Sequence, residues 1–279
     1  MMSLCVPPFP RKTLVMGIVN VTPDSFFDGG FLSDMDKLRD HAAAMARDGA
    51  DILDVGGEST RPGADPVSPE EELRRVLPAV EALTPLNIPV SVDTYHAETA
   101  RRALALGAVM VNDITALRGD PGMAELIGAL GCPCVLMHMQ GEPRTMQQAP
   151  RYDDVVDDIR AFFEERLHFA AAAGIREEQI WLDPGFGFGK TVDQNLLLLR
   201  RLNEFNCFGR PLLLGVSNKS TLGAVLGADV NDRTDGTAAA VAFSAARGVH
   251  CVRVHDVKTM ARVVRVCDAI TRGRARNDG

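Results

Sequence analysis

Short runs of β-branched and aliphatic residues alternate with longer amphipathic stretches along the chain, and this alternation constrains the fold more than any other feature. The runs lie at residues 13–19, 51–55, 88–92, 109–112, 134–137, 180–182, 211–216 and 251–254. Their length and composition are typical of buried strands, and the stretches between them have the length of helices. A strand and a helix repeated eight times in about 250 residues predict an α/β fold, a (β/α)8 TIM barrel, with a doubly wound sheet as the alternative.

The predicted helices carry start and stop signals. Ser68 precedes Pro69 and Glu71 as a capping box, in which Ser68 accepts from a free backbone N–H and Glu71 bonds back to Ser68. Glycines at which we expect left-handed helix ends follow five helical stretches: Gly49, Gly107, Gly131, Gly174 and Gly248. Because no Pro/Gly/Ser-rich linker divides the chain, we expect a single domain over residues 1–279, with its core at about 12–270.

Composition narrows the class of protein. Apolar residues make up 46% of the chain, enough for a large core, and the net charge of -7 argues against a nucleic-acid partner. The six cysteines include a C-x-C pair, Cys132 and Cys134, but no C-x-x-C, so we expect reduced thiols rather than disulfides or a zinc site. Prolines near the N-terminus argue against a signal peptide, and no run approaches about 20 apolar residues. We therefore expect a soluble, cytoplasmic protein without a membrane partner.

The stretch "DPGFGFGKT" at residues 183–191 has the appearance of a phosphate-binding loop, but its spacing is wrong for one. A P-loop needs a glycine five positions before the Gly-Lys pair, and Pro184 occupies that place and has no backbone N–H to donate. The three glycines also miss the G-x-G-x-x-G spacing of dinucleotide-binding proteins. Asp183 is then the residue of interest in this stretch.

Polar residues follow every predicted strand, at the end of the barrel where such folds carry their chemistry. They are Asn20, Glu58, Thr60, Arg61, Asp93, Asn112, Asp113, His138, Asp183, Ser217, Lys219, Arg253 and His255. Any one Asp or Asn there could cap the following helix, and a single His could be a structural residue. Polar residues at all eight strand ends together predict one pocket.

This pocket combines two chemistries. Groups that suit a flat heterocycle are Asp93, Asn112, Asp183 and Lys219, because a carboxylate can accept two parallel N–H bonds from a guanidine-like ring edge. Groups that suit an anion such as a phosphate or pyrophosphate are Asn20, Arg253 and His255, with Arg61 in a nearby loop. One ligand could carry both parts.

Eight motifs in order resemble those of the dihydropteroate synthase family, the sulfonamide targets of folate biosynthesis. The motifs are "MGIVNVTPDSFFDGG", "DVGGESTRPGA", "SVDT", "NDI", "LMHMQGEP", "LDPGFGFGK", "SNKS" and "RVHDV", and the resemblance runs from about Lys12 to Asp268. It implies a transferase that condenses 6-hydroxymethyl-7,8-dihydropterin pyrophosphate with p-aminobenzoate, giving 7,8-dihydropteroate and pyrophosphate. It also implies a homodimer.

The resemblance further implies a role for each matching residue. The pterin would contact Asp93, Asn112, Asp183, Phe188 and Lys219. Pyrophosphate would contact Asn20, Arg253 and His255, with Mg²⁺ between Asn20 and the pyrophosphate oxygens. The p-aminobenzoate site would include Thr60, Arg61, Pro62 and Ser217, under a lid at residues 22–30. The catalytic residues would be Asp93, Lys219 and Arg253: positive charge stabilises the leaving group, and Asp93 stabilises the cationic methylene.

Two positions depart from the family pattern, and two other functions stay open. Asn218 stands where the family usually has arginine, and Phe27 where a small serine is common. A related pterin barrel could pass a one-carbon unit to a corrinoid partner, but that function leaves the Arg253 and His255 anion site without a purpose. The protein could also be a barrel that holds a pterin without catalysis, but the intact Asp93, Asp183, Lys219 and Arg253 argue against such a loss of activity. Release of pyrophosphate on mixing the two substrates separates all three.

Overall fold

Eight parallel strands form the centre of the protein in a computed structural model that describes residues 5–22, 31–59 and 63–273. The strands are β1 (Leu14–Asn20), β2 (Ile52–Gly56), β3 (Val90–Asp93), β4 (Met110–Asp113), β5 (Cys134–Met137), β6 (Ile180–Asp183), β7 (Leu213–Leu214) and β8 (Cys251–Val254). They pair in the order β6-β5-β4-β3-β2-β1-β8-β7, and a parallel bridge between Leu182 and Leu212 joins the two ends of that order. The predicted (β/α)8 barrel is confirmed, and each predicted run overlaps one strand.

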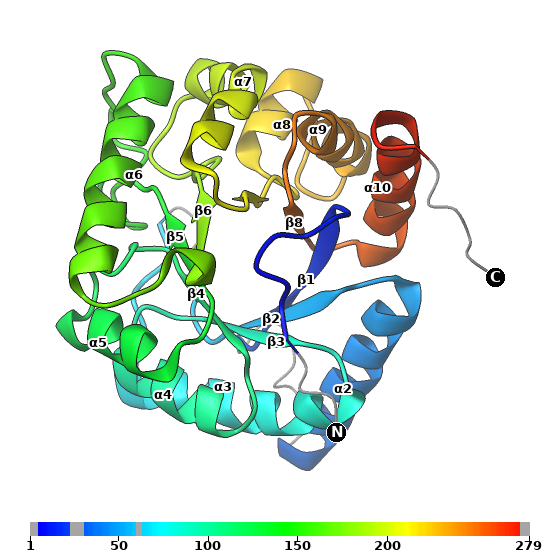
Figure 1. Ribbon diagram of the computed structural model, residues 1–279. Helices are drawn as coiled ribbons and strands as arrows, with labels where there is room; N and C mark the ends of the chain where they lie inside the picture. Colours follow the sequence, from blue (N-terminus) through cyan, green and yellow to red (C-terminus); the bar gives the residue numbers. More distant parts are fainter. Residues whose placement is uncertain (1–4, 23–30, 60–62, 274–279) are drawn as a thin grey trace.

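Helices surround the strands on all sides (Figure 1). The α-helices of the described chain are α2 (Phe31–Asp48), α3 (Pro69–Leu83), α4 (Ala97–Ala105), α5 (Pro121–Leu130), α6 (Val155–Ala172), α7 (Val192–Arg200), α8 (Ser220–Leu226), α9 (Thr234–Ala246) and α10 (Val257–Thr271). Short 3-10 helices lie at η1 (Thr84–Leu86), η2 (Glu177–Gln179) and η3 (Leu202–Phe208). Each strand is thus followed by at least one helix before the next strand begins.

The predicted helix ends are confirmed with one correction. The five glycines named above all have left-handed φ angles, between 69° and 110°. Ser68 caps α3 by accepting from the backbone N–H of Glu71. The carboxylate of Glu71 does not return to Ser68, however, because it forms ion pairs of 2.7 Å with Arg74 and Arg75 in the next turn. Only half of the capping box is therefore present.

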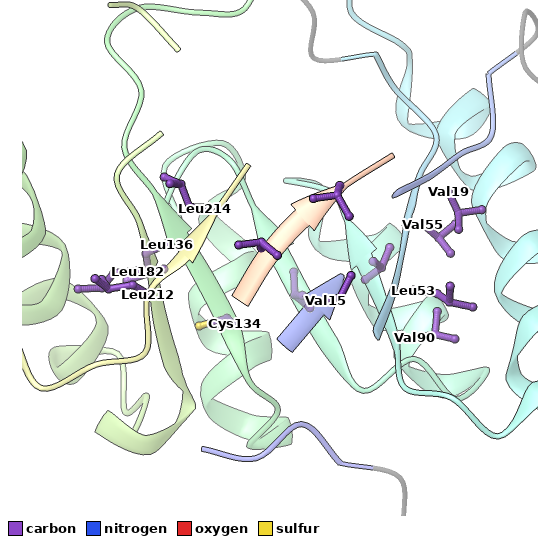
Figure 2. Packing of buried hydrophobic residues seen from close by; sticks show 14 of the residues in the cluster. Val15, Val19, Leu53, Val55, Val90, Cys134, Leu136, Leu182, Leu212 and Leu214 are labelled. Atoms are coloured by element: carbon purple, nitrogen blue, oxygen red, sulfur yellow. The ribbon is translucent and has the colours of Figure 1, made fainter. Parts of the chain in front are cut away.

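The main hydrophobic core lies between the strands and the surrounding helices. Figure 2 shows part of it, with Val15, Leu53, Leu136, Leu182 and Leu214 among the strand side chains. Each of these residues is at most 2% exposed. Since successive side chains of a strand point to opposite faces, their neighbours in sequence must point into the barrel.

A second, smaller cluster fills the interior of the barrel near the N-terminal ends of the strands. Its buried members are Val6, Leu14, Met16, Ile52, Met110, Val135, Trp181, Leu213 and Cys251. All except Val6 belong to strands, and they alternate with the outward-facing residues of the main core. Side chains therefore fill the barrel near the N-terminal ends of its strands. Inward-facing positions become available for chemistry only one layer further, toward the C-terminal ends.

Candidate active site

The next inward-facing layer, toward the C-terminal ends of the strands, contains five polar residues. Counting two residues onward from Ile52, Ser91, Met110, Trp181 and Cys251 gives Asp54, Asp93, Asn112, Asp183 and Arg253. Because strand side chains repeat with a period of two, these five side chains share one face and enter one layer of the barrel. Four of them were predicted as site residues, whereas Asp54 was not.

An arginine between two carboxylates occupies the middle of this layer. Arg253 Nε donates to Asp54 Oδ2 over 2.6 Å, and Arg253 Nη2 donates to Asp93 Oδ2 over 2.7 Å. Asn112 Nδ2 donates to the same Asp54 oxygen over 3.0 Å. The geometry therefore fixes the guanidinium and the amide through Asp54, which is fully buried.

The charges in this cluster depend on one another. Burial raises the pKa of Asp93, and Arg253 opposes that rise. Burial alone would lower the pKa of Arg253, but Asp54, Asp93 and Asp183 raise it overall. The arginine thus stays charged and acts as the counterion that lets two carboxylates lie at this depth.

Asp183 ends β6 and is only 5% exposed. Its Oδ1 accepts from the backbone N–H of Gly185 over 2.7 Å. Burial raises the pKa of Asp183 to about 6, against the effects of the Gly185 N–H, Lys219, Lys190 and Arg253. At neutral pH the carboxylate is therefore mainly ionised and can accept hydrogen bonds from a ligand.

Phe188 and Lys219 lie against each other beside Asp183. The ammonium of Lys219 is 4.0 Å from the centroid of the Phe188 ring, which is itself buried. A Cβ at Gly187 would come within 3.0 Å of Lys219 Cδ, and the φ of Gly187 is 84°. Glycine suits this position chiefly because a residue with a Cβ is strained at this φ, and the loop also passes close to the lysine.

The predicted anion-binding residues lie at more open positions. Ser217 Oγ and His255 Nδ1 are 2.9 Å apart, and the backbone N–H of His255 donates to Ser217 Oγ over 3.2 Å. His255 is exposed, and Asn20 is half-buried at the end of β1. Ser217, which was predicted for p-aminobenzoate, therefore positions a residue predicted for pyrophosphate.

Three polar strand-end residues have structural partners instead. Asp113 accepts from Thr115 and Leu117 in the turn after β4. Glu58 accepts from the Tyr95 hydroxyl over 3.0 Å. The buried His138 bonds to Lys190 and packs against Phe162. His138 follows the structural alternative left open by the sequence, whereas Asp113 closes the turn after β4 and does not cap α5, whose N-cap is Asp120.

Several predicted residues lie outside the described part of the chain: Thr60, Arg61, Pro62, Phe27 and residues 23–30 of the predicted lid. Asn218, the other departure from the family pattern, has a left-handed φ of 56°. Asparagine adopts this conformation more readily than arginine does, so the substitution suits its backbone.

Among the described residues, no three or more His, Cys, Asp or Glu side chains gather so that they could hold a metal ion. A Mg²⁺ ion bound mainly by substrate oxygens, with Asn20 as its protein ligand, needs no such group. Within the same residues, no helix has both the length and the apolar character needed to span a membrane.

Comparison with known proteins shows the family to which the chain belongs. The family model described as pterin binding enzyme matches residues 16–255. The dihydropteroate synthase of Escherichia coli (strain K12) is 48% identical over 256 residues, which cover 91% of this chain and 90% of the relative. Two solved dihydropteroate synthases superimpose with a TM-score of 0.88. The Yersinia pestis enzyme with a sulfonamide drug complex is 44% identical, with coverage of 93% and 94%. The Xanthomonas albilineans enzyme with 4-aminobenzoic acid is 43% identical, with coverage of 95% and 98%.

Proposed function

Because this chain belongs to the pterin binding enzymes, and within them to the dihydropteroate synthases, we propose how its residues carry out the family reaction. The reaction joins 6-hydroxymethyl-7,8-dihydropterin pyrophosphate to p-aminobenzoate. The C–O bond between the pterin methylene and pyrophosphate breaks, a C–N bond forms to the amine, and the amine loses a proton to solvent. The products are 7,8-dihydropteroate and pyrophosphate.

The observation that carries this proposal is the buried carboxylate of Asp183 in the polar layer. A carboxylate at this depth needs donors, and the amino-pyrimidine edge of a pterin offers two in parallel. Asn112 and Asp93 line the same layer for other ring atoms, and Phe188 with Lys219 provides a flat wall beside them.

We assign the leaving group to Arg253, His255 and Asn20. The bonds from Arg253 to Asp54 and Asp93 orient its guanidinium before substrate arrives. Bound Mg²⁺, held by Asn20 and by pyrophosphate oxygens, would supply further positive charge to the departing group. Asp93 is then well placed to stabilise the cationic methylene, and the neutral aniline nitrogen needs no strong base.

The p-aminobenzoate site is assigned to Ser217 and Lys219 together with Thr60, Arg61 and Pro62 of the second loop. The relatives solved with a sulfonamide and with 4-aminobenzoic acid support a site for this substrate class. On these assignments, the bond between Ser217 and His255 supports a meeting point of the two substrates at this serine.

The decisive experiment mixes the purified protein with both substrates and measures released pyrophosphate. We expect release that requires p-aminobenzoate and Mg²⁺, and that is lost in Asp183→Asn. Pterin binding without release would favour the binding-only barrel, and transfer of a one-carbon unit to a corrinoid would favour the methyltransferase.

We further propose a homodimer that forms through α9 and α10. Phe243 on α9 and Val266 and Ile270 on α10 are 40%, 61% and 78% exposed. An apolar groove runs between these helices, and two alanines, two valines and Ile270 are among its lining residues. A second copy covering this face would bury all three side chains. Sedimentation should show a dimer that Ile270→Glu dissociates, and a monomeric parent protein would contradict the assignment.

A cytoplasmic location also remains a proposal. All six cysteines are free thiols, including the exposed Cys5 and Cys207, which suits a reducing compartment. Fractionation of the source cells would test it.

A further inference from the structure

Lys190 is a buried lysine that the assignments above leave without a role. It is 2% exposed and lies directly after the three glycines of the loop that follows β6. Its ammonium contacts three acceptors: Gly185 O at 2.8 Å, Phe188 O at 3.0 Å and His138 Nδ1 at 3.0 Å. An ammonium has three N–H bonds, so the set satisfies it completely.

Two further side chains hold the same loop. Gln147 donates to Gly187 O over 2.6 Å, and the Tyr152 hydroxyl donates to Gly189 O over 2.8 Å. A Cβ at Gly185 would overlap the carbonyl oxygen of His138. The loop is therefore pressed against its neighbours and has little freedom to take another shape. Lys190 is the charged group that binds its carbonyls at Gly185 and Phe188.

The groups around Lys190 decide its charge. Burial lowers the pKa of Lys190 to about 7, Asp183 opposes this, and Lys219 adds to it. Burial, Lys190 and Arg118 hold the pKa of His138 well below its usual range, so the imidazole is neutral and can accept from the ammonium. In turn, Lys190 is one of the cations that favour the ionised form of Asp183.

We propose that Lys190 is a positioning residue of the pterin site, which holds the carbonyls of Gly185 and Phe188 so that Asp183 and the Phe188 ring face the substrate. Its two bonds draw the ends of the turn together, which keeps the Gly185 N–H on Asp183 and the Phe188 ring against Lys219. Its charge supports the carboxylate form of Asp183. This inference rests on the proposed assignment of Asp183 to the pterin.

The test compares Lys190→Met with Tyr152→Phe, using calorimetry with 6-hydroxymethylpterin over pH 5 to 8. Lys190→Met removes the charge and both loop bonds, so we expect binding weaker by about tenfold or more. The pH at which binding is half lost should also move upward, because the cation that lowers the Asp183 pKa is gone. Tyr152→Phe removes one neutral bond at Gly189 and keeps the ring near Lys190, so its pH midpoint should stay unchanged.

A second variant separates charge from bonding and guards against misfolding. Lys190→Gln keeps an N–H donor for the loop carbonyls but carries no charge, so its pH midpoint should rise as in Lys190→Met while its affinity at pH 8 stays closer to that of the parent protein. Lys190→Arg should keep the parent midpoint. Folded Lys190→Met or Lys190→Gln with parent affinity and midpoint would overturn the proposal.

The proposed pterin site is tested separately by Asp183→Asn. If Asp183→Asn loses pterin while the Lys190 variants do not, the site assignment stands and the role of Lys190 is wrong. If Asp183→Asn binds pterin normally, the site assignment itself fails, and the role of Lys190 fails with it.

Discussion

The two halves of the candidate site differ in how completely the protein prepares them. On the pterin side, Asn112 and Asp183 are 3% and 5% exposed and already hydrogen-bonded within the barrel. On the pyrophosphate side, His255 is exposed and Asn20 is half-buried. The first set lies on strands, whereas His255 follows the end of β8. On these assignments, we expect a ring edge to bind to a preformed surface and the anion to help assemble its own site.

Arg253 joins the two halves, so its loss should have the largest effect. In Arg253→Ala, Asp54 and Asp93 stay buried without their counterion, and we expect the free energy of unfolding to fall by about 3–5 kcal/mol. Urea denaturation measures this. Pyrophosphate affinity should fall further than the affinity for free pterin. A variant that lost pterin but kept pyrophosphate would show that this strand end is assigned to the wrong half.

Asp183→Asn should damage the preformed half selectively. A carboxamide presents one acceptor and one donor where two ligand donors arrive, and breaking such a buried charge-assisted pair costs about 2–5 kcal/mol. Calorimetry should show a corresponding loss of pterin affinity, with pyrophosphate binding much less affected. Near-normal pterin affinity in the folded variant would remove Asp183 from this role.

The order of substrate binding tests whether the p-aminobenzoate site forms only after pyrophosphate has bound. Fixing each loop residue costs about 1–2 kcal/mol, and pyrophosphate with Mg²⁺ beside Asn20 can offset that cost. We expect p-aminobenzoate to bind the pterin complex at least about tenfold more tightly when Mg²⁺ and pyrophosphate are present. Equal affinity with and without them would mean that the p-aminobenzoate site is already formed.

The pH dependence of pterin binding sharpens the same contrast. Because the pKa of Asp183 is raised to about 6, the carboxylate accepts a proton as pH falls through that value. Pterin affinity should therefore be nearly constant above about pH 7 and fall by roughly fivefold between pH 6 and 5 if binding requires the ionised form. Affinity that is unchanged down to pH 4.5 would indicate that the neutral carboxyl binds equally well.

Ser217→Ala should have the smallest effect and act mainly on the open half. It removes the bond that positions His255, which is worth about 0.5–1.5 kcal/mol. Steady-state kinetics should show a modest rise in KM for the pterin pyrophosphate substrate. A larger rise in KM for p-aminobenzoate would indicate that Ser217 acts mainly in p-aminobenzoate binding.

The periodic features of the sequence predicted the barrel and most of the polar layer, because strand ends converge wherever parallel strands close on themselves. Asp54 was not predicted, because the prediction considered the residues that follow each strand and Asp54 lies inside a strand. Its signal was present: Asp54 interrupts the apolar run at 51–55 in an inward position, two residues after Ile52. A buried acid there requires a cation, and only the fold shows that Arg253, far along the chain, provides it.

Lys190 was missed for a different reason. In a phosphate-binding loop the lysine of this motif would face the ligand. Because the glycine spacing excludes such a loop, the sequence offers no partner for the lysine. Its actual partners include His138, which is 52 residues earlier in the chain. Such a contact depends on how two loops pack, and no local spacing in the sequence encodes it.

The single bridge between Leu182 and Leu212 has a consequence for how the protein is made. β7 and β8 pair mainly with each other and with β1, the earliest strand in the described part of the chain. Until they are synthesised, β1 and β6 are unpaired edges that can pair with other chains. At about 5–20 residues per second, the 71 residues that follow Asp183 up to Val254 take about 4–14 s, and the edge of β1 is exposed for longer. Nascent chains are therefore most prone to aggregate just before β8 emerges, when chaperones are needed most.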